Sequence, residues 1–253
     1  MIKEAERQKP SVIFEGMTSI SAVIKGQKRA VKHIYYDCSK EKSKAKELGF
    51  LRRKSVELGF EITACDSDFI DSLSTGNTHG GIIAECTEFT VPSIDASEII
   101  DNGFYVMIEG IEDPYNFGYA IRSIYAAGAD GIILTERNWM SAAGVVCRAS
   151  AGASEMIPLY NAPAIDAIDT MRTKGYKIAC AGIRDSVSAF EADLKMPVFL
   201  IVGGEKRGIS SQILSKSDMI VRLDYGREFS GSLSAASAAS ILSYEVLRQN
   251  LNK

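Results

Sequence analysis

Residues Phe104–Arg122 read FYVMIEGIEDPYNFGYAIR, and this stretch decides the fold that the sequence predicts. Its first five residues form a continuous apolar run, which is typical of a strand buried on both faces of a parallel sheet. An Asp-Pro turn follows, and Asn116 is well placed to accept from the free N–H groups of a helix that begins there. The stretch therefore predicts a strand, a loop and a helix, the repeating unit of an α/β protein.

Further apolar runs and helical patterns alternate along the C-terminal part of the chain. The predicted strands are Phe104–Ile108, Gly131–Leu134, Lys177–Ala181, Val198–Val202 and Met219–Leu223, and the predicted helices are Gly118–Ala127, Ala142–Ala151, Ala164–Lys174 and Ser232–Leu251. This alternation predicts a parallel sheet flanked by helices. In such sheets the ligand lies beyond the carboxyl ends of the strands, so the loops there are the candidate sites.

The N-terminal part predicts a smaller α/β domain. Its expected elements are a helix at Met17–Lys25, a strand at Val31–Tyr36, a helix at Glu41–Gly59, strands at Glu61–Cys65 and Gly81–Ala84, and a polar loop at Ser74–Gly81. A stretch rich in small and acidic residues around Pro92 is the best candidate for a linker. We expect domains at 1–90 and 103–253, joined by a linker at 91–102.

Composition places the chain among ordinary globular proteins. It has 253 residues, of which 46% are hydrophobic and 24% charged. The sequence shows no apolar run long enough for a membrane span and no signal peptide, so we expect a cytoplasmic protein. Its five cysteines are scattered and it has two histidines, so neither a disulfide framework nor a metal site is expected.

The charge of the chain is unevenly distributed. Residues 1–60 contain 14 Lys and Arg against 7 Asp and Glu, whereas the rest contains 15 basic and 25 acidic residues. A basic N-terminal part favours binding to a phosphate backbone, because cationic side chains release the counterions condensed on nucleic acid. A solvated helix face is the alternative interpretation of the basic residues between Lys40 and Lys54.

The loop after Val198–Val202 reads Gly-Gly-Glu-Lys-Arg-Gly-Ile-Ser over residues 203–210. It is not a dinucleotide fingerprint, because Glu205 stands where the second glycine would be and would repel a pyrophosphate. Its glycines allow the backbone of the loop to approach a ligand closely, and the carboxylate of Glu205 favours a ligand that is not strongly anionic. S-adenosylmethionine (AdoMet) fits this description. A surface carboxylate paired with Lys206 or Arg207 is the other interpretation of Glu205.

Together with the small-residue stretch Gly226–Ala239, these loops resemble the signature motifs of the SpoU/TrmH family of SPOUT-class RNA ribose methyltransferases. The first motif, Asp113-Pro114-x-Asn116-x-Gly118-x-x-x-Arg122, is the most specific, and Ser150-Ala151-Gly152-Ala153 looks like a further family segment. The N-terminal part is similar to the ribosomal-protein-like RNA-binding domain of many members.

The resemblance implies a homodimer in which a parallel sheet forms a trefoil knot and the knot regions pack together. It implies AdoMet as methyl donor, RNA as partner with ribosomal RNA favoured over transfer RNA, and no membrane or metal. The expected cofactor-binding residues are Gly203, Gly204, Gly208, Leu223, Ser232 and Leu233.

The expected catalytic residues are Arg122, Asn116, Glu205 and Ser234. A guanidinium is effectively always protonated, so our hypothesis is that Arg122 stabilises the developing 2′-alkoxide instead of removing a proton.

The third motif departs from the family pattern. Leu223-Asp224-Tyr225 replaces Ile-Pro-Met, Ser234 replaces an asparagine and Ala236 replaces a serine. The sequence therefore leaves three functions open: an active but divergent rRNA ribose methyltransferase, a tRNA-directed one, and a non-catalytic RNA-binding protein with the same fold.

Overall fold

The computed structural model describes residues 11–76, 78–135, 142–204 and 208–251. They form two compact units. Unit 1 holds the described residues of 1–90 and 139–156, and unit 2 holds those of 91–138 and 157–253. The first division between the units follows residue 90, and residues 142–156, which we assigned to the C-terminal domain, pack with unit 1.

Unit 1 is built on a four-stranded sheet with the order β1-β4-β2-β3. The strands are β1 (Ser11–Glu15), β2 (Val31–Asp37), β3 (Glu61–Cys65) and β4 (Ile82–Thr87). Both β1 and β2 run antiparallel to β4, and β2 runs parallel to β3. Strand β1 was not predicted, because its central apolar run is too short to be distinguished from the start of the following helix.

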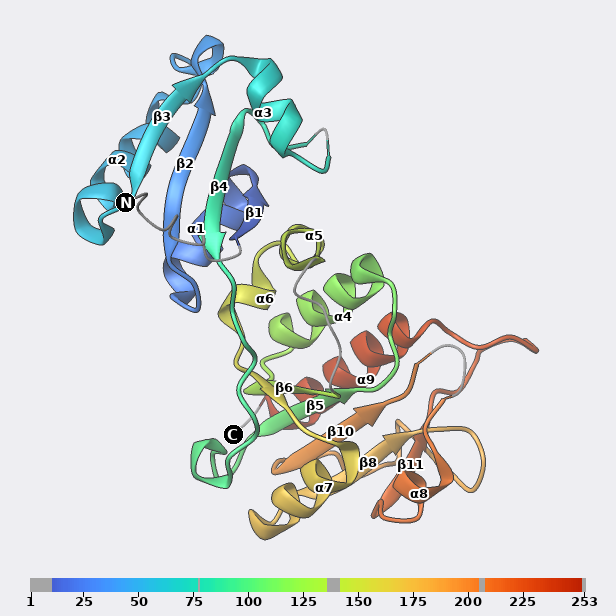
Figure 1. Cartoon of the computed structure of the whole chain (residues 1–253). Helices are drawn as coiled ribbons and strands as arrows, with labels where there is room; N and C mark the ends of the chain where they lie inside the picture. The colour runs from blue at the N-terminus through green and yellow to red at the C-terminus, as the bar shows by residue number, and fades with distance from the viewer. Residues whose placement is uncertain (1–10, 77, 136–141, 205–207, 252–253) are drawn as a thin grey trace, which may run out of the picture. The chain divides into compact units, whose positions relative to one another are not determined.

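Helices α1 (Gly16–Gly26) and α2 (Ala45–Leu58) cover one face of this sheet (Figure 1). Their apolar side chains, Ile20 and Leu48 among them, form one buried cluster with Phe14 and Ile34 of the strands. The short 3-10 helix Cys38–Lys40 and α3 (Ser67–Leu73) complete the N-terminal elements. The α/β architecture expected for this part is therefore present, with α2 shorter than the predicted Glu41–Gly59.

The remaining elements of unit 1, α5 (Ala143–Ala149) and α6 (Ala153–Met156), come from the later part of the chain. They approach β1 and α1 so closely that three glycines are required. A Cβ at Gly144 would lie 2.2 Å from the carbonyl oxygen of Ile13, and one at Gly26 would lie 1.9 Å from that of Glu155. At Gly152 a Cβ would lie 2.5 Å from the Cβ of Ala22.

A buried ion pair fastens the same segment. Arg29 Nε donates to Glu155 at 3.0 Å, and the two side chains are 5% and 4% exposed. The Arg29 guanidinium also lies 5.2 Å from the ring centroid of Phe14, and Lys28 Nζ donates to the carbonyl of Ser154 at 2.9 Å. Burial is the main reason why the pKa of Lys28 falls to about 8.

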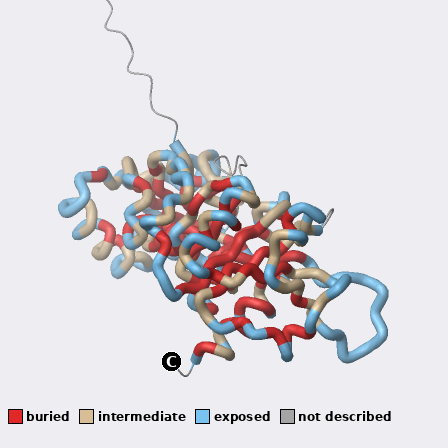
Figure 2. Tube along the Cα trace, turned by 90° about the horizontal axis from the view of Figure 1, so that it is seen from below, coloured by how far each residue is buried: buried red, intermediate tan, exposed pale blue. Residues whose placement is uncertain are grey.

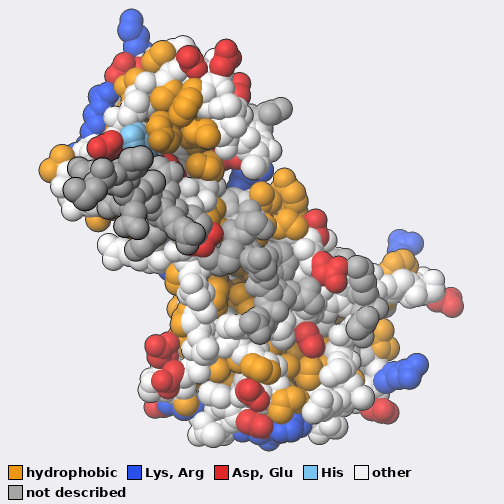
Figure 3. Space-filling view, viewed as in Figure 1, with side chains coloured by type: hydrophobic (Ala, Val, Ile, Leu, Met, Phe, Trp, Pro, Cys, Tyr) orange, Lys and Arg blue, Asp and Glu red, His pale blue; other side chains and the backbone are white. Residues whose placement is uncertain are grey.

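Most of the expected basic helix is neutralised by neighbouring carboxylates. Lys44 pairs with Glu47 at 3.2 Å and Lys54 pairs with Glu57 at 2.5 Å, each three residues apart. Acidic side chains are interspersed with basic ones on the face of unit 1 that Figure 3 shows. The interpretation of α2 as a solvated, ion-paired helix face therefore describes these positions better than a continuous basic patch does.

Unit 2 contains a seven-stranded sheet with the order β7-β6-β5-β10-β8-β11-β9, in which every pairing is parallel. The strands are β5 (Phe104–Ile108), β6 (Gly131–Leu134), β7 (Leu159–Asn161), β8 (Lys177–Ala181), β9 (Val187–Ser188), β10 (Val198–Val202) and β11 (Met219–Arg222). All five residues of β5 and of β10 are buried, as their continuous apolar runs predicted, and Figure 2 shows buried segments of the chain with exposed segments around them.

Helices cover both faces of the sheet (Figure 1). On one face α7 (Ala164–Thr173) and α8 (Ser211–Leu214) bury Ile168, Met171 and Ile213 against the strands. On the other, α4 (Pro114–Ala126) and α9 (Ala235–Asn250) pack against each other. No described helix is long and apolar enough to cross a membrane.

The expected linker is an integral part of unit 2. Asn161 N donates to the carbonyl of Pro92 at 2.7 Å, and Ile94 N donates to the carbonyl of Asn161 at 3.0 Å. A 3-10 helix follows at Ala96–Glu98, and Ile99 is buried in the sheet core. Residues 91–102 therefore do not behave as a free tether, because two isoleucines in this polar stretch supply the apolar contacts.

The Arg29–Glu155 pair generates the first prediction. Replacing Glu155 with Gln removes one partner of a buried pair, and we expect a loss of about 3 kcal/mol in the free energy of unfolding. Urea denaturation followed by circular dichroism measures this loss. E57Q, which breaks the exposed Lys54–Glu57 pair, is the control and should cost much less. Equal losses in the two variants would contradict a structural role of the buried pair.

Candidate active site

The first two motif loops leave the sheet side by side. Val202 at the end of β10 pairs with Ile108 at the end of β5, and Glu109 N donates to the carbonyl of Val202 at 2.9 Å. The strand that follows β5 in sequence lies on its other side, so the sheet reverses its winding direction between β5 and β10. A reversal of this kind opens a crevice at the carboxyl ends of the strands, where α/β proteins bind ligands.

Two glycines bring these loops into backbone contact. A Cβ at Gly204 would lie 2.3 Å from the carbonyl oxygen of Gly110 and 2.7 Å from its Cα, so no side chain fits there. Gly110 has φ +87°, a conformation that favours glycine. The sequence analysis expected Gly204 to approach a ligand and gave Gly110 no role. The structure shows that the close approach of Gly204 is to the first loop.

The second loop also closes on itself. Gly208 N donates to the carbonyl of Gly204 at 3.1 Å, and Gly208 has φ +61°. A Cβ at Gly203 would lie 2.5 Å from the carbonyl carbon of Gly208. The three glycines that we expected at the cofactor therefore have different structural reasons: Gly203 packs within the second loop, Gly204 packs on the first loop, and Gly208 adopts a positive φ. Glu205, which we expected to be catalytic, lies outside the described residues.

Asp113, not Asn116, caps the helix that follows the first loop. The Asp113 carboxylate accepts from Asn116 N at 2.8 Å, and Pro114 occupies the first helical position. The cap prediction for Asn116 was wrong because the helix begins four residues before the expected Gly118. Asn116 instead lies in the first turn, and its side chain remains half-buried near the first loop.

Arg122 is exposed on α4. Among the residues that the structure describes, no carboxylate forms an ion pair with it, although Glu109, Glu112 and Asp113 are near it in the sequence. Helical spacing places Arg122 on the same face as Tyr115 and Tyr119, which are 44% and 51% exposed. The guanidinium is therefore available to a ligand on an aromatic helix face.

Side-chain hydrogen bonds hold the start of the third loop. Leu223 follows β11, and the next residue, Asp224, accepts from Ser188 Oγ and from Arg222 Nε. The hydrogen bond from Ser188 and then the one from Arg222 lower the pKa of Asp224, so it remains ionised at neutral pH. Asp224 thus anchors a position where the family pattern has proline.

An aromatic pair organises the rest of the third loop. The rings of Tyr225 and Phe229 lie 5.7 Å apart with an interplanar angle of 58°, and a Cβ at Gly231 would lie 2.5 Å from the Phe229 ring. The Tyr225 hydroxyl accepts from Leu233 N at 3.3 Å. Tyr225 thereby fixes the backbone of a residue that we expected at the cofactor. The sequence analysis noted Tyr225 only as a departure from the family pattern.

Ser234 caps the last helix. Its hydroxyl accepts from Ser237 N at 3.1 Å and donates to Ser237 Oγ at 3.0 Å. An asparagine at this position would also be a good cap, so the exchange of asparagine for serine keeps the start of α9 in place. The predicted cofactor residues Ser232 and Leu233 are exposed immediately before this cap.

Cys147 and Cys180 are buried in the cores of the two units. Burial raises the pKa of the Cys147 thiol to about 12 and that of Cys180 to about 11, so neither forms a thiolate at neutral pH. In the described ranges no three His, Cys, Asp or Glu side chains are grouped as metal ligands.

Fold and site together define an α/β protein with a parallel sheet and a topological switch point between β5 and β10. The model of the SpoU rRNA methylase family matches residues 103–244, and the chain belongs to this family. The match confirms the resemblance on which the motif residues were assigned.

Relatives support the same conclusion. A Staphylococcus saprophyticus protein assigned to the TrmH family of tRNA/rRNA methyltransferases is 31% identical over 186 residues, which are 71% of this chain and 74% of that protein. The 23S rRNA (guanosine-2′-O-)-methyltransferase RlmB of Shewanella oneidensis is 26% identical and covers 96% of this chain and 98% of its own.

Solved structures show the same fold. An AdoMet-bound rRNA methyltransferase from Sinorhizobium meliloti superposes with a TM-score of 0.78 at 24% identity, covering 94% of this chain and 87% of its own. The SpoU methyltransferase AviRb from Streptomyces viridochromogenes in complex with AdoMet gives 0.77 at 22% identity, covering 96% and 92%.

The cap at Ser234 generates the second prediction. S234A removes the acceptor for Ser237 N and should lower the free energy of unfolding by about 1 kcal/mol. S234N restores the residue of the family pattern and, as a capping residue, should leave stability near that of the wild type. Thermal or urea unfolding measures both variants, and an equal loss in both would show that the hydroxyl does not act as a cap.

Proposed function

We propose that this chain transfers the methyl group of AdoMet to a ribose 2′-hydroxyl in RNA, and that ribosomal RNA is the substrate. The observation that carries the proposal is the crevice between β5 and β10, where the first two motif loops meet through Gly110 and Gly204. The full-length relative RlmB, named for guanosine 2′-O-methylation of 23S rRNA, supports the choice of ribosomal RNA.

The residues of the second and third loops fit AdoMet better than an anionic nucleotide. Gly203, Gly204 and Gly208 shape the described part of the second loop, and Leu233 offers an apolar side chain that is 37% exposed. Backbone groups and apolar surface suit a neutral adenosine. We assign Leu223, Ser232 and Leu233 to the adenosine and methionine parts of AdoMet, which supplies an electrophilic methyl group when bound.

Within this proposal Arg122 acts on the ribose. Its guanidinium remains protonated, so it stabilises negative charge that develops on the 2′-oxygen and does not remove the proton. Asn116 orients the first loop and the ribose from the first turn of α4, and Glu205 orients the second loop. Ser234 contributes by keeping the start of α9 in place.

Three further properties belong to the proposal. We infer a trefoil knot in the C-terminal part of unit 2, an RNA-binding role for unit 1, and a cytoplasmic homodimer. The dimer is supported by exposed apolar side chains on the two helices that pack together, Tyr119 on α4 and Ile241 and Tyr244 on α9. Light scattering on the purified protein measures the oligomeric state directly.

The role of Arg122 generates the third prediction. R122A should reduce turnover about 100-fold or more, because the charge that stabilises the alkoxide is lost. AdoMet affinity, measured by calorimetric titration, should change little. R172A, which removes another exposed arginine of unit 2, is the control and should retain activity. Near-normal turnover in R122A would contradict the mechanism.

The substrate generates the fourth prediction. Deleting the gene should remove ribose methylation at one or a few positions of ribosomal RNA, detected by mapping 2′-O-methylation across total RNA. Loss of a methyl group from transfer RNA alone would instead favour the tRNA-directed alternative. If purified protein bound no AdoMet at millimolar concentration, the chain would be a non-catalytic RNA-binding protein.

A further inference from the structure

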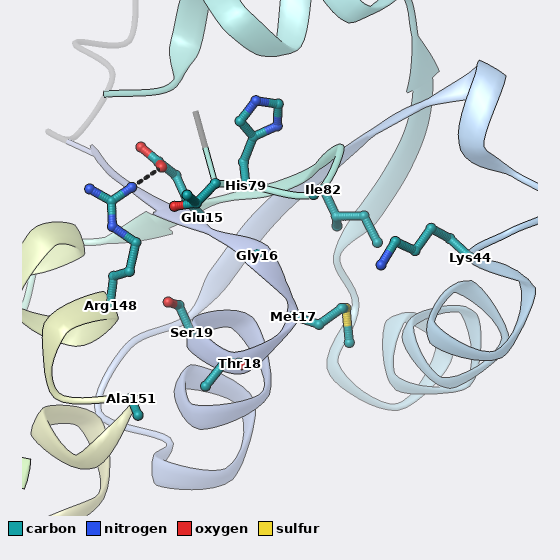
Figure 4. A pocket seen from close by; sticks show the side chains of 12 residues that line it. Glu15, Gly16, Met17, Thr18, Ser19, Lys44, His79, Ile82, Arg148 and Ala151 are labelled. Atoms are coloured by element: carbon teal, nitrogen blue, oxygen red, sulfur yellow. Dashed lines mark hydrogen bonds and ion pairs between the residues drawn. The ribbon is translucent and has the colours of Figure 1, made fainter. Parts of the chain in front are cut away.

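Unit 1 contains a cavity of about 390 Å³ that lies outside the motif loops (Figure 4). Ligand pockets commonly measure about 300–1,000 Å³, so its size suits a small ligand or one residue of a polymer. The first turn of α1, the loop Thr78–Ile82, Lys44 and the end of α5 form its walls. All of these belong to unit 1.

Two cationic side chains approach the cavity from opposite sides. Lys44 extends its ammonium group into it from the start of α2, and Arg148 lies across from it (Figure 4). Glu47 pairs with Lys44 at 3.2 Å, but both side chains remain about one-third exposed, so Lys44 can also contact a ligand. The Lys44 ammonium group favours an anion, because a phosphate accepts hydrogen bonds from several donors at once.

One carboxylate, Glu15, lies in the wall, and it is already neutralised. Its Oε1 accepts from Thr75 N at 2.6 Å and from Thr75 Oγ1 at 2.8 Å, while its Oε2 accepts from Arg148 Nη1. The Glu15 side chain is 5% exposed. Glu15 therefore fixes the position of Arg148 and presents little net negative charge to the cavity.

Because Glu15 is directed towards Thr75, its side chain does not cap α1. The N–H groups of Met17 and Thr18, in the first turn, have no intrahelical acceptor. No other acceptor for them is found within the described part of the chain. Both residues line the cavity, and Thr18 adds a hydroxyl group. These N–H groups and the Thr18 hydroxyl therefore lie at the same cavity as the Lys44 ammonium group.

Contacts of His79 hold the wall formed by the loop before β4, and the lining of the cavity is partly apolar. His79 Nδ1 accepts from Gly81 N at 3.1 Å, which leaves the proton on Nε2, 3.0 Å from Asp71. This pair of contacts holds the loop before β4. Ile82 and Met17 supply apolar surface in the same cavity. Cationic and N–H donors beside apolar surface match a phosphate that carries a sugar better than a bare ion.

We propose that this cavity binds a backbone phosphate of RNA, held by Lys44 and the N–H groups of Met17 and Thr18, with the adjoining ribose against Met17 and Ile82. The identification of the polymer as RNA rests on the proposed function, whereas the anion site rests on the cavity alone. Arg148 and Ala151 come from the part of the chain that the family model matches. The site is therefore incomplete in residues 1–90 alone.

Lys54 provides a matched control for the test. Lys44 and Lys54 both stand on or at the start of α2 and both pair with a glutamate three residues later, but only Lys44 lines the cavity. The full-length protein is titrated with a short mixed-sequence oligoribonucleotide at several salt concentrations. K44Q should weaken binding roughly three- to tenfold and reduce the salt slope by about 0.7, while K54Q should change affinity less than about twofold.

A second measurement tests the N–H groups. Titration of the wild-type protein with inorganic phosphate should shift the amide resonances of Met17 and Thr18, and K44Q should weaken that response. Absence of these shifts, or equal RNA affinities for K44Q and K54Q, overturns the proposal. Shifts with phosphate but unchanged RNA affinity in K44Q would show an adventitious ion only.

Methyl transfer distinguishes this inference from the proposed function. With a methylatable RNA, K44Q should raise KM and leave both kcat and AdoMet affinity unchanged. If the wild-type protein bound RNA through Lys44 but transferred no methyl group, the proposed function would fail and the phosphate site would stand.

Discussion

The backbone contact between Gly110 and Gly204 is the constraint on which the arrangement of the site depends. Parallel pairing of β5 with β10 brings the two loops to the same edge, but only glycine allows them to touch there. Any larger residue at position 204 would push the loops apart and widen the crevice. The loop shape is thus set by packing within the protein, before any ligand contributes.

A second constraint joins the early and late parts of the sequence within unit 1. Three close glycine contacts and the Arg29–Glu155 pair hold residues 142–156 against β1 and α1. Each of the two buried charges is compensated by its oppositely charged partner. Removing either side chain would leave the other charge buried and unpaired, which is strongly destabilising. Strands β6 and β7 belong to the sheet of unit 2. Consequently the segment that connects them completes the core and the cavity wall of unit 1.

The divergent third motif is explained by local compensation. Asp224 makes side-chain hydrogen bonds where a proline would restrict the backbone, Tyr225 holds the N–H of Leu233, and Ser234 caps α9. At Asp224 hydrogen bonds replace the conformational restraint of a proline, whereas the exchange at Ser234 keeps a capping residue in place. The departures therefore leave a loop that is held by its own side chains, while they change the groups that the loop presents.

The sequence by itself determined the buried strands, the α/β class and the three motif loops, because continuous apolar runs and glycine-rich turns report local physics. Tertiary structure alone decided that Asp113 caps α4, that Gly204 packs on Gly110, and that residues 142–156 belong to unit 1. These outcomes depend on which segments meet across long separations in the chain. The pattern of side chains shows that a surface is apolar or made of small residues, but it does not show which segment of the chain will cover that surface.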